Sequence, residues 1–301
     1  MNVYLSGQRL NEVLEELTLS KTSREAAATL SAVILTAAAD TYFPGLTAAL
    51  GGAVTLSGDD GSVRFSGGVQ DIRRTPERVM ITAYDRGIYL TRNELYGVFS
   101  GSGAEIAAQV AASLGIALGR VDAPAGVQTI VTGSGDTAYD ILRQAVGADR
   151  EIAMEGERLC IGPGTEDPVP VAAERVLDVE SVGSLEQMVN RAVVLRRGTD
   201  TPLATAQDAA AMAAYGQFQT ARALSGDSAQ AQASAALRGA AYTARLTVPG
   251  DLALRCGGRV TLSAPQWGLE GIYGITGVEH CWRQGRFTTA LALNRMEGGG
   301  T

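Results

Sequence analysis

Hydrophobic and polar residues alternate along the first hundred positions as they do in half-buried β-strands. In residues 54–72, VTLSGDDGSVRFSGGVQDI, two alternating runs flank an Asp-Asp-Gly turn, which predicts a β-hairpin. Residues 78–85, RVMITAYD, alternate as a further strand. Residues 23–35, SREAAATLSAVIL, combine helix-favouring alanines with alternation in their second half. Both interpretations remain open there, and we favour a strand.

The middle of the chain changes to a helical period and contains an internal repeat. Residues 102–115 and 134–147 each begin with Ser-Gly and end with glycine, and both place apolar residues at helical spacing. Ser102 followed by Glu105 fits a capping box, and each final glycine suits the position after a helix end. Short strands are predicted around these helices at residues 115–121, 127–133 and 151–162. Together these elements predict a small α/β module.

The last third of the chain mixes strands with alanine-rich segments. Three prolines and two acidic residues in residues 161–170 indicate an exit linker. Residues 188–195 have the pattern of a strand, and residues 204–218 and 227–246 are predicted to be helical in their alanine-rich parts. The chain returns to strands at the end, with a turn at Gln284-Gly285; those strands are predicted at residues 259–265, 271–284 and 285–296.

Charge divides the chain unevenly. Residues 1–100 carry a net charge of −2, residues 101–180 carry −8, and residues 181–301 carry +3, which add to the total of −7. An acidic middle between nearly neutral flanks suggests three units rather than one.

The composition narrows the class of protein. A chain of 301 residues with 46% hydrophobic and 19% charged residues is neither disordered nor membrane-like. The longest apolar-leaning run, residues 30–39, is shorter than the ~18–20 residues of a spanning helix. The N-terminal residues show no basic-then-apolar signal pattern. We therefore expect neither membrane insertion nor secretion.

Several residue types are scarce in this chain, which argues against some kinds of binding site. One histidine is too few for a multi-histidine zinc site, and a pI near 4.9 argues against broad phosphate binding. Cys160, Cys256 and Cys281 lack a CxxC spacing, so we interpret them as reduced thiols. The single lysine, Lys21, stands against 24 arginines. We interpret this imbalance as a consequence of codon usage.

Two motifs resemble catalytic or binding sequences but have plainer interpretations. GSGDT at residues 133–137 precedes a helix, yet it lacks the Lys-Ser/Thr ending of a phosphate loop and carries an acidic residue, so we expect helix capping. His280 and Cys281 are neighbours in a predicted strand and therefore point to opposite faces, which argues against a nucleophilic pair. We expect His280 to be a partly buried structural residue.

Short clusters of acidic and basic residues occur in four places along the chain, and each has an ordinary structural explanation. Asp59-Asp60 and Asp149-Arg150-Glu151 lack the spacing of a calcium loop, and we expect solvated turns. Arg73-Arg74 and Arg196-Arg197 lack the interleaved aromatics of nucleic-acid sites and are candidate subunit contacts. We predict no catalytic, cofactor-binding or metal-ligating residue, and no cofactor.

Residues 81–116, ITAYDRGIYLTRNELYGVFSGSGAEIAAQVAASLGI, resemble the baseplate hub proteins of contractile-tailed phages and PBSX-like prophages, relatives of the late-control protein D family. Further segments follow in the same order as in that family; they are residues 184–195, 214–220, 268–282 and 285–293. The resemblance covers about residues 50–295 and depends on order and extent rather than on one diagnostic motif. The first fifty residues match poorly.

The resemblance implies an α+β, mainly β fold with two tail-tube-like β-barrel domains and a small α/β domain between them. The implied boundaries are residues 1–96, 97–168 and 169–301. It further implies a structural hub that forms a homotrimeric, pseudo-hexameric ring, which joins the tail tube protein to a spike or wall-degrading tail protein and contacts other baseplate proteins. DNA would pass through the lumen without specific binding. The protein would reside in the virion tail baseplate after assembly in the host cytoplasm.

Two other classes of function remain as alternatives. The chain could be a cell-wall-binding or wall-degrading module, which requires a carboxylate pair or a Cys/His set in a cleft. It could also be a small-molecule enzyme carried by the α/β module. No catalytic constellation in the sequence favours either alternative, so we do not expect an enzyme.

Overall fold

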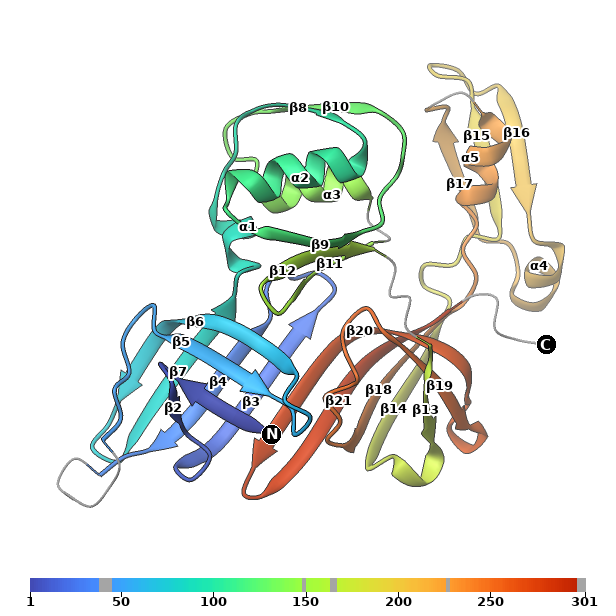
Figure 1. The fold of residues 1–301 in the computed structure, drawn as a ribbon. Coiled ribbons are helices and arrows are strands. Elements are labelled where there is room, and N and C mark those ends of the chain that lie inside the picture. The colour runs from blue at the N-terminus through green and yellow to red at the C-terminus, as the bar shows by residue number, and fades with distance from the viewer. Residues whose placement is uncertain (38–44, 148–149, 163–166, 226–227, 297–301) are drawn as a thin grey trace. The chain divides into compact units, whose positions relative to one another are not determined.

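The computed structural model describes residues 1–37, 45–147, 150–162, 167–225 and 228–296 (Figure 1). Two compact units are present: Met1–Val179 with Arg245–Thr301, and Glu180–Ala244. The three-way division at residues 96 and 168 stays a prediction.

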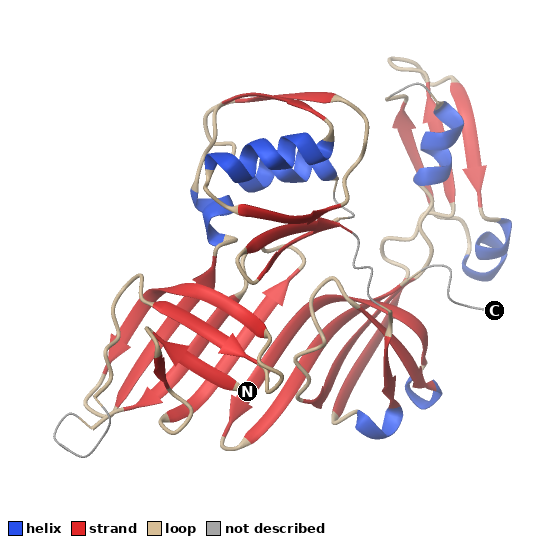
Figure 2. Ribbon diagram, viewed as in Figure 1, coloured by secondary structure: helices blue, strands red, loops and turns tan. Residues whose placement is uncertain are grey.

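A thirteen-stranded sheet dominates the larger unit (Figure 2). Its strands in chain order are β1 (Asn2–Leu5), β2 (Gln8–Arg9), β3 (Leu14–Thr22), β4 (Thr29–Leu35), β5 (Ala53–Ser57), β6 (Val63–Arg74), β7 (Arg78–Asp85), β13 (Val169–Ala172), β14 (Asp178–Ser184), β18 (Ala241–Pro249), β19 (Arg259–Ala264), β20 (Leu269–Arg283) and β21 (Arg286–Arg295). Two short 3₁₀ helices, Ala173–Arg175 and Pro265–Trp267, accompany it. The predicted mainly β class is confirmed.

Alternation in the first part of the chain produces the expected strands. β5 and β6 form the predicted hairpin around a turn in which Gly61 has a φ of +78°. The predicted strand at 78–85 is β7, and the ambiguous segment 23–35 ends in β4. Inward side chains from β1 and β3–β7 form one core, which includes Leu17, Leu30 and Ile81.

The two ends of the chain are joined by backbone pairing between β3 and β20. The antiparallel register runs from Gly277 opposite Thr22 to Arg283 opposite Glu16. β20 is long enough to pair with β19 through its first half, with β3 through its second half and with β21 from Tyr273 to Arg283. The sequence did not predict that strands of the first and last parts of the chain would share one sheet.

The segment between β7 and β13 forms the predicted α/β module. Its elements are α1 (Ile88–Arg92), β8 (Gly97–Gly101), α2 (Gly103–Ser113), β9 (Ala117–Val121), β10 (Gln128–Thr132), α3 (Ala138–Val146), β11 (Glu151–Glu155) and β12 (Arg158–Gly162). Helices α2 and α3 lie between the β8–β10 ribbon and the β11–β12–β9 sheet (Figure 1). Apolar faces from all three layers form a second core.

Both repeated helices begin with a capping box, but the box lies at a different position within each repeat. Ser102 accepts from the backbone N–H of Glu105, as predicted, and the Glu105 side chain accepts from the Ser102 N–H. The second helix does not begin at the predicted Ser134. Its N-cap is Thr137, which forms the same box with Asp140. The Ser-Gly similarity therefore misplaced the start of α3 by three residues.

The smaller unit contains a three-stranded sheet in the order β16–β15–β17 with two short helices. Its elements are β15 (Arg191–Leu195), β16 (Pro202–Gln207), α4 (Ala209–Tyr215), β17 (Gln219–Ala223) and α5 (Ala229–Ala235). The alanine-rich parts of the segments 204–218 and 227–246 are helical as predicted, in α4 and α5, while residues 204–207 belong to β16 and residues 241–246 to β18. Pairing with neighbouring strands overrides the helical preference of alanine at these positions.

Two local predictions at the end of the larger unit have different outcomes. Gln284 and Gly285, with φ values of 50° and 74°, form the predicted turn between β20 and β21. The linker prediction at 161–170 is wrong at both ends. Residues 161–162 end β12, and residues 169–170 enter β13, which pairs in parallel with β19; residues 163–166 lie outside the described residues. Among the helices that the structure describes, none has the length and apolarity needed to span a bilayer.

Candidate functional site

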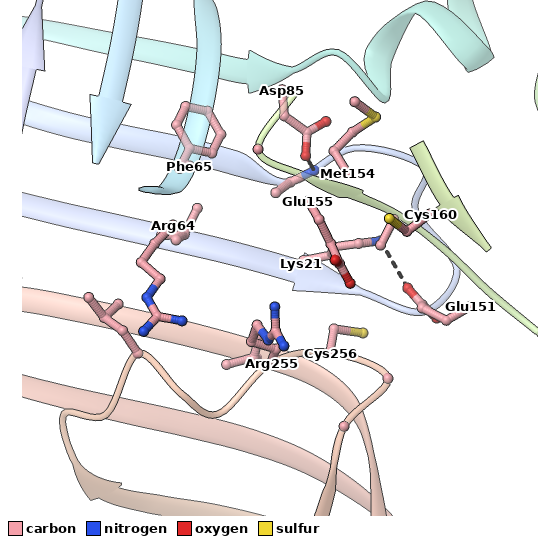
Figure 3. A pocket seen from close by; sticks show the side chains of 18 of the residues that line it. Lys21, Arg64, Phe65, Asp85, Glu151, Met154, Glu155, Cys160, Arg255 and Cys256 are labelled. Atoms are coloured by element: carbon pink, nitrogen blue, oxygen red, sulfur yellow. Dashed lines mark hydrogen bonds and ion pairs between the residues drawn. The ribbon is translucent and has the colours of Figure 1, made fainter. Parts of the chain in front are cut away.

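The larger unit contains a cavity of about 140 Å³ where three distant stretches of the chain meet (Figure 3). Strands β3 and β6 supply one wall, β11 and β12 of the α/β module supply another, and the loop before β19 supplies a third. The lining mixes basic, acidic and thiol side chains; the labelled members in Figure 3 are Lys21, Arg64, Phe65, Asp85, Glu151, Met154, Glu155, Cys160, Arg255 and Cys256.

Lys21 is the centre of the contacts between β3 and the α/β module. Its side chain is 11% exposed, and Nζ lies 3.0 Å from Oε1 of Glu151, whose side chain is 13% exposed. Nζ also donates to the backbone carbonyls of Glu25 at 3.0 Å and Ile152 at 3.3 Å. The ammonium group thus makes two hydrogen bonds to backbone carbonyls and one close ion pair with Glu151. The only lysine of the chain is therefore a structural connection, which the codon-usage interpretation overlooked.

Arg143 makes a second connection between the same two parts of the unit. Its guanidinium donates to the backbone carbonyls of Ser23 at 3.0 Å and of Arg150, and its Nε donates to the Tyr139 hydroxyl at 2.9 Å. The guanidinium carbon also lies 5.0 Å from the centre of the Tyr139 ring. Arg143 thus connects α3 to the segment that follows β3.

Glu151 also contacts the last part of the chain. Gly257 has a φ of +81°, and a Cβ built on it would lie 2.9 Å from Cγ of Glu151. A side chain at Gly257 would therefore be strained by its backbone conformation and crowded by Glu151. Glu151 was predicted to lie in a solvated turn with Asp149 and Arg150. That prediction is wrong for Glu151, which is in β11 and forms the ion pair with Lys21, and Asp149 lies outside the described residues.

Burial shifts the acid–base behaviour of two groups in this cavity. Desolvation raises the pKa of Asp85 to about 6, although its carboxylate accepts the backbone N–H of Ala28 at 3.0 Å and of Gly87 at 2.8 Å. Desolvation lowers the pKa of His280 to about 4. His280 is 4% exposed, and its Nδ1 lies 3.0 Å from the Thr289 hydroxyl. The expectation that His280 is structural agrees with this burial.

The thiols of the cavity are poorly suited to nucleophilic chemistry. Burial raises the pKa of Cys256 to about 12 and also raises the pKa of Cys160, while a reactive cysteine needs a lowered pKa. All three cysteines are free thiols, as expected. Among the residues that the structure describes, no group of three or more His, Cys, Asp or Glu side chains is arranged to hold a metal ion.

The remaining sequence motifs lie apart from this cavity. In GSGDT, the Asp136 carboxylate accepts the Gly133 N–H at 2.8 Å, so this loop caps itself. Asp60 accepts from the N–H and hydroxyl of Ser62 in the β5–β6 turn, and these hydrogen bonds lower the pKa of Asp60. Asp59 is paired with the N-terminal amine. The solvated-turn interpretation fits both aspartates.

The arginine doublets are exposed at strand ends, as predicted. Arg73 and Arg74 end β6, where Arg74 donates to the carbonyl of Ala48 at 2.6 Å. Arg196 and Arg197 follow β15 in the smaller unit. Their role as subunit contacts stays a prediction.

The chain matches the YQBQ-like family over residues 17–294. No curated protein matches it. The 43 kDa tail protein of prophage MuSo2 from Shewanella oneidensis has a similar structure over 97% of both chains, with a TM-score of 0.73 and 14% identity. A tail protein from Neisseria meningitidis MC58 is similar over 98% of this chain and 95% of its own, with a TM-score of 0.72 and 14% identity.

A third solved structure comes from a different kind of assembly. The Escherichia coli c3393 protein, a component of the type VI secretion system with structural similarity to the T4 tail proteins gp27 and gp5, has a TM-score of 0.62 and 9% identity. The match covers 99% of this chain and 78% of that one. These three structures show that the chain has a fold found in tail proteins and in a secretion-system component.

Proposed function

The chain belongs to the YQBQ-like family, and from this premise we propose that it is a structural hub of a contractile phage tail or a phage-tail-like particle. The observation that carries the proposal is the match to a prophage tail protein along 97% of both chains. The match includes both the large sheet and the α/β module, so it is not limited to a common substructure.

The proposed assembly is a homotrimer in which each chain contributes two curled halves of its sheet to a pseudo-hexameric ring. The β3–β20 ladder supports this arrangement because it makes the two halves one continuous sheet within a chain. The ring would adapt the tail tube to a spike or wall-degrading tail protein, beside other baseplate proteins. Its place would be the virion baseplate, following assembly in the host cytoplasm.

Light scattering and electron microscopy test the proposed trimer. Three copies of the 31.2 kDa chain give a mass of about 94 kDa, and images should show three-fold rings with a central hole. A particle of 31.2 kDa at every concentration, with no rings in the presence of tube or spike protein, would contradict the proposal.

DNA passage through the ring also follows from the proposal. Three chains together carry −21, and negative charge in the lumen would let DNA slide, because phosphate binding depends on cations. An electrophoretic mobility assay at low salt should show no stable complex with duplex DNA. Tight, salt-sensitive binding of duplex DNA to the protein would refute the proposal that DNA passes through the ring without binding to it.

We propose no catalytic role for the chain. Raised thiol pKa values and a neutral, buried His280 support this view of the cavity. Purified protein should leave peptidoglycan intact in a clearing assay. Clearing that disappears when one carboxylate is replaced would favour the wall-degrading alternative.

A further inference from the structure

The β8–β10 ribbon has one buried face and one exposed apolar face. Phe99 lies opposite Ile130 in the register, and both are buried against α2 and α3. On the other face Val98 lies opposite Val131, and these side chains are 65% and 74% exposed. Tyr96, just before β8, is 90% exposed.

A fourth apolar side chain extends this surface, which we call the ribbon face: Tyr96, Val98, Val127 and Val131. Val127 precedes β10 and is 81% exposed. Large apolar residues that gather at such exposure, rather than singly, mark a surface that another molecule covers. A standard stable interface contains ~20–30 residues from each partner, and the ribbon face has only four large apolar side chains. The ribbon face is therefore too small to hold two copies of this chain together through side-chain contacts alone.

Backbone pairing would supply the missing interactions. β8 and β10 form a two-stranded sheet, so each has an edge with no strand neighbour in the described part of the chain. Edge strands are ordinarily protected by charge, proline or a covering element. The sequences GVFSG and QTIVT contain neither charge nor proline. On β8, the Ser100 carbonyl already accepts from Gln109 of α2 at 2.9 Å, which leaves β10 as the more open edge.

The charge around the ribbon indicates what kind of strand would pair there. Residues 93–147 carry five acidic and two basic side chains. The two arginines of this segment lie away from the ribbon: Arg120 lines the cavity, and Arg143 donates to the carbonyl of Ser23 after β3. Exposed Glu94 and half-buried Asp136 lie close to Tyr96, because the Leu95 N–H donates to the Asp136 carbonyl at 3.0 Å. A strand with a basic residue at the end beside Tyr96 is the electrostatic complement of these two carboxylates.

We propose that the β8–β10 ribbon docks an extended segment of another protein, which adds to β10 as a third strand. Alternate apolar side chains of that segment would lie beside Val131 and extend the apolar face of the ribbon. A basic residue at one end of the segment would face Glu94 and Asp136. Main-chain hydrogen bonds supply affinity in this mode of recognition, and alternate side chains supply specificity. The inference stands on the ribbon itself and does not depend on the tail role.

Peptide binding to the full chain tests the proposal. The probe is a fluorescent peptide of sequence RRVTVTVTR, followed by anisotropy, with hydrogen exchange measured over residues 128–132. We expect saturable binding and slower exchange in β10. A peptide with glutamate in place of arginine should bind at least tenfold more weakly, and a peptide with proline at its centre should not bind. Absence of binding, or binding that leaves exchange in β10 unchanged, overturns the proposal.

Matched variants locate the site. Val131→Lys should weaken binding at least tenfold, and Tyr96→Ser, which lies outside both strands and spares their pairing, should weaken it several-fold. Val63→Lys on β6 introduces the same change at an unrelated valine that is 49% exposed, and it should leave binding unchanged. Equal affinity for all variants overturns the proposal. So does a dimer of the free chain that Val131→Lys abolishes, because a second copy would then be the occupant.

Discussion

Replacing Lys21 by methionine tests how strongly the cavity contacts stabilise the larger unit. Methionine keeps much of the length of the side chain but removes the ammonium group. The substitution leaves the Glu151 carboxylate without its counter-ion at 3.0 Å. It also removes the donor to the carbonyls of Glu25 and Ile152.

The expected loss follows from the burial of this pair. Removing one partner of a buried ion pair costs about 3–5 kcal/mol, because an uncompensated charge remains in the interior. The side chains of Lys21 and Glu151 are 11% and 13% exposed, so some water reaches them and the lower end of that range applies. We therefore expect Lys21→Met to reduce the free energy of unfolding by about 3 kcal/mol.

Urea denaturation followed by tryptophan fluorescence measures this loss. Trp267 and Trp282 are the only tryptophans of the chain, and both lie in the larger unit. The control is Arg78→Met, which breaks the exposed pair with Glu15, where Nε and Oε2 are 2.6 Å apart. Exposed pairs contribute little to stability, so the control midpoint should hardly move. Equal midpoints for Lys21→Met and Arg78→Met would refute the reasoning.

A double variant separates lost pairing from lost packing. Lys21→Met combined with Glu151→Met removes both charges, and replacing a buried pair by apolar groups is often nearly neutral. It should therefore recover most of the stability that Lys21→Met loses. A double variant less stable than the single variant would contradict the buried-charge argument. An amine-reactive reagent should modify Lys21, the only lysine, slowly in the native protein and faster in Glu151→Gln, with peptide mapping to separate Lys21 from the N-terminal amine.

Three further predictions concern titration, capping and thiol reactivity. The folded state keeps His280 neutral down to a pKa of about 4, while the unfolded chain takes up the proton near pH 6.5. The free energy of unfolding should therefore fall by about 3 kcal/mol as the pH is lowered from 6.5 to 4. Asp85, with its pKa raised to about 6, acts in the opposite direction, because the folded state holds a proton that the unfolded chain loses above about pH 4. Asp85→Asn should therefore steepen the loss of stability from pH 6 to 4 in urea titrations, and an unchanged slope would argue against it. Thr137→Ala should cost about 1 kcal/mol and Ser134→Ala almost nothing; equal losses in thermal unfolding would restore Ser134 as the cap. The Cys256 thiol, with a pKa of about 12, should resist iodoacetamide at pH 8 until the protein is denatured, as judged by mass spectrometry, and rapid labelling of the native protein would contradict its burial.

Local patterns predicted those elements whose structure depends on nearby residues. The β5–β6 hairpin, β7, the cap of α2 and the Gln284–Gly285 turn each follow from alternation, a capping pair or turn residues within a few positions. The start of α3 was misplaced because the similarity to the first helix pointed to Ser134, whereas the acidic box partner Asp140 stands three residues after Thr137 and none stands three residues after Ser134.

The cavity could not be predicted from the sequence, because it is assembled from distant parts of the chain. Lys21 and Glu151 are 130 positions apart, and the nearby loop at Gly257 is a further hundred positions on. No spacing rule connects them. The one available signal was that Lys21 is unique, and rarity by itself does not distinguish a constrained position from a codon preference. The pairing of β3 with β20 was hidden for the same reason.

The β3–β20 ladder also has a consequence for synthesis of the chain. The edge of β3 that receives β20 stays open until about 260 further residues have been made, which takes tens of seconds at ~5–20 residues per second. An open edge during that interval can pair with another nascent chain. β3 carries Glu15, Glu16 and Lys21 within nine residues, and charges of this kind discourage such pairing. These side chains thus protect the growing polypeptide before β20 exists, and two of them, Glu16 and Lys21, later take part in the finished contacts with Arg283 and Glu151.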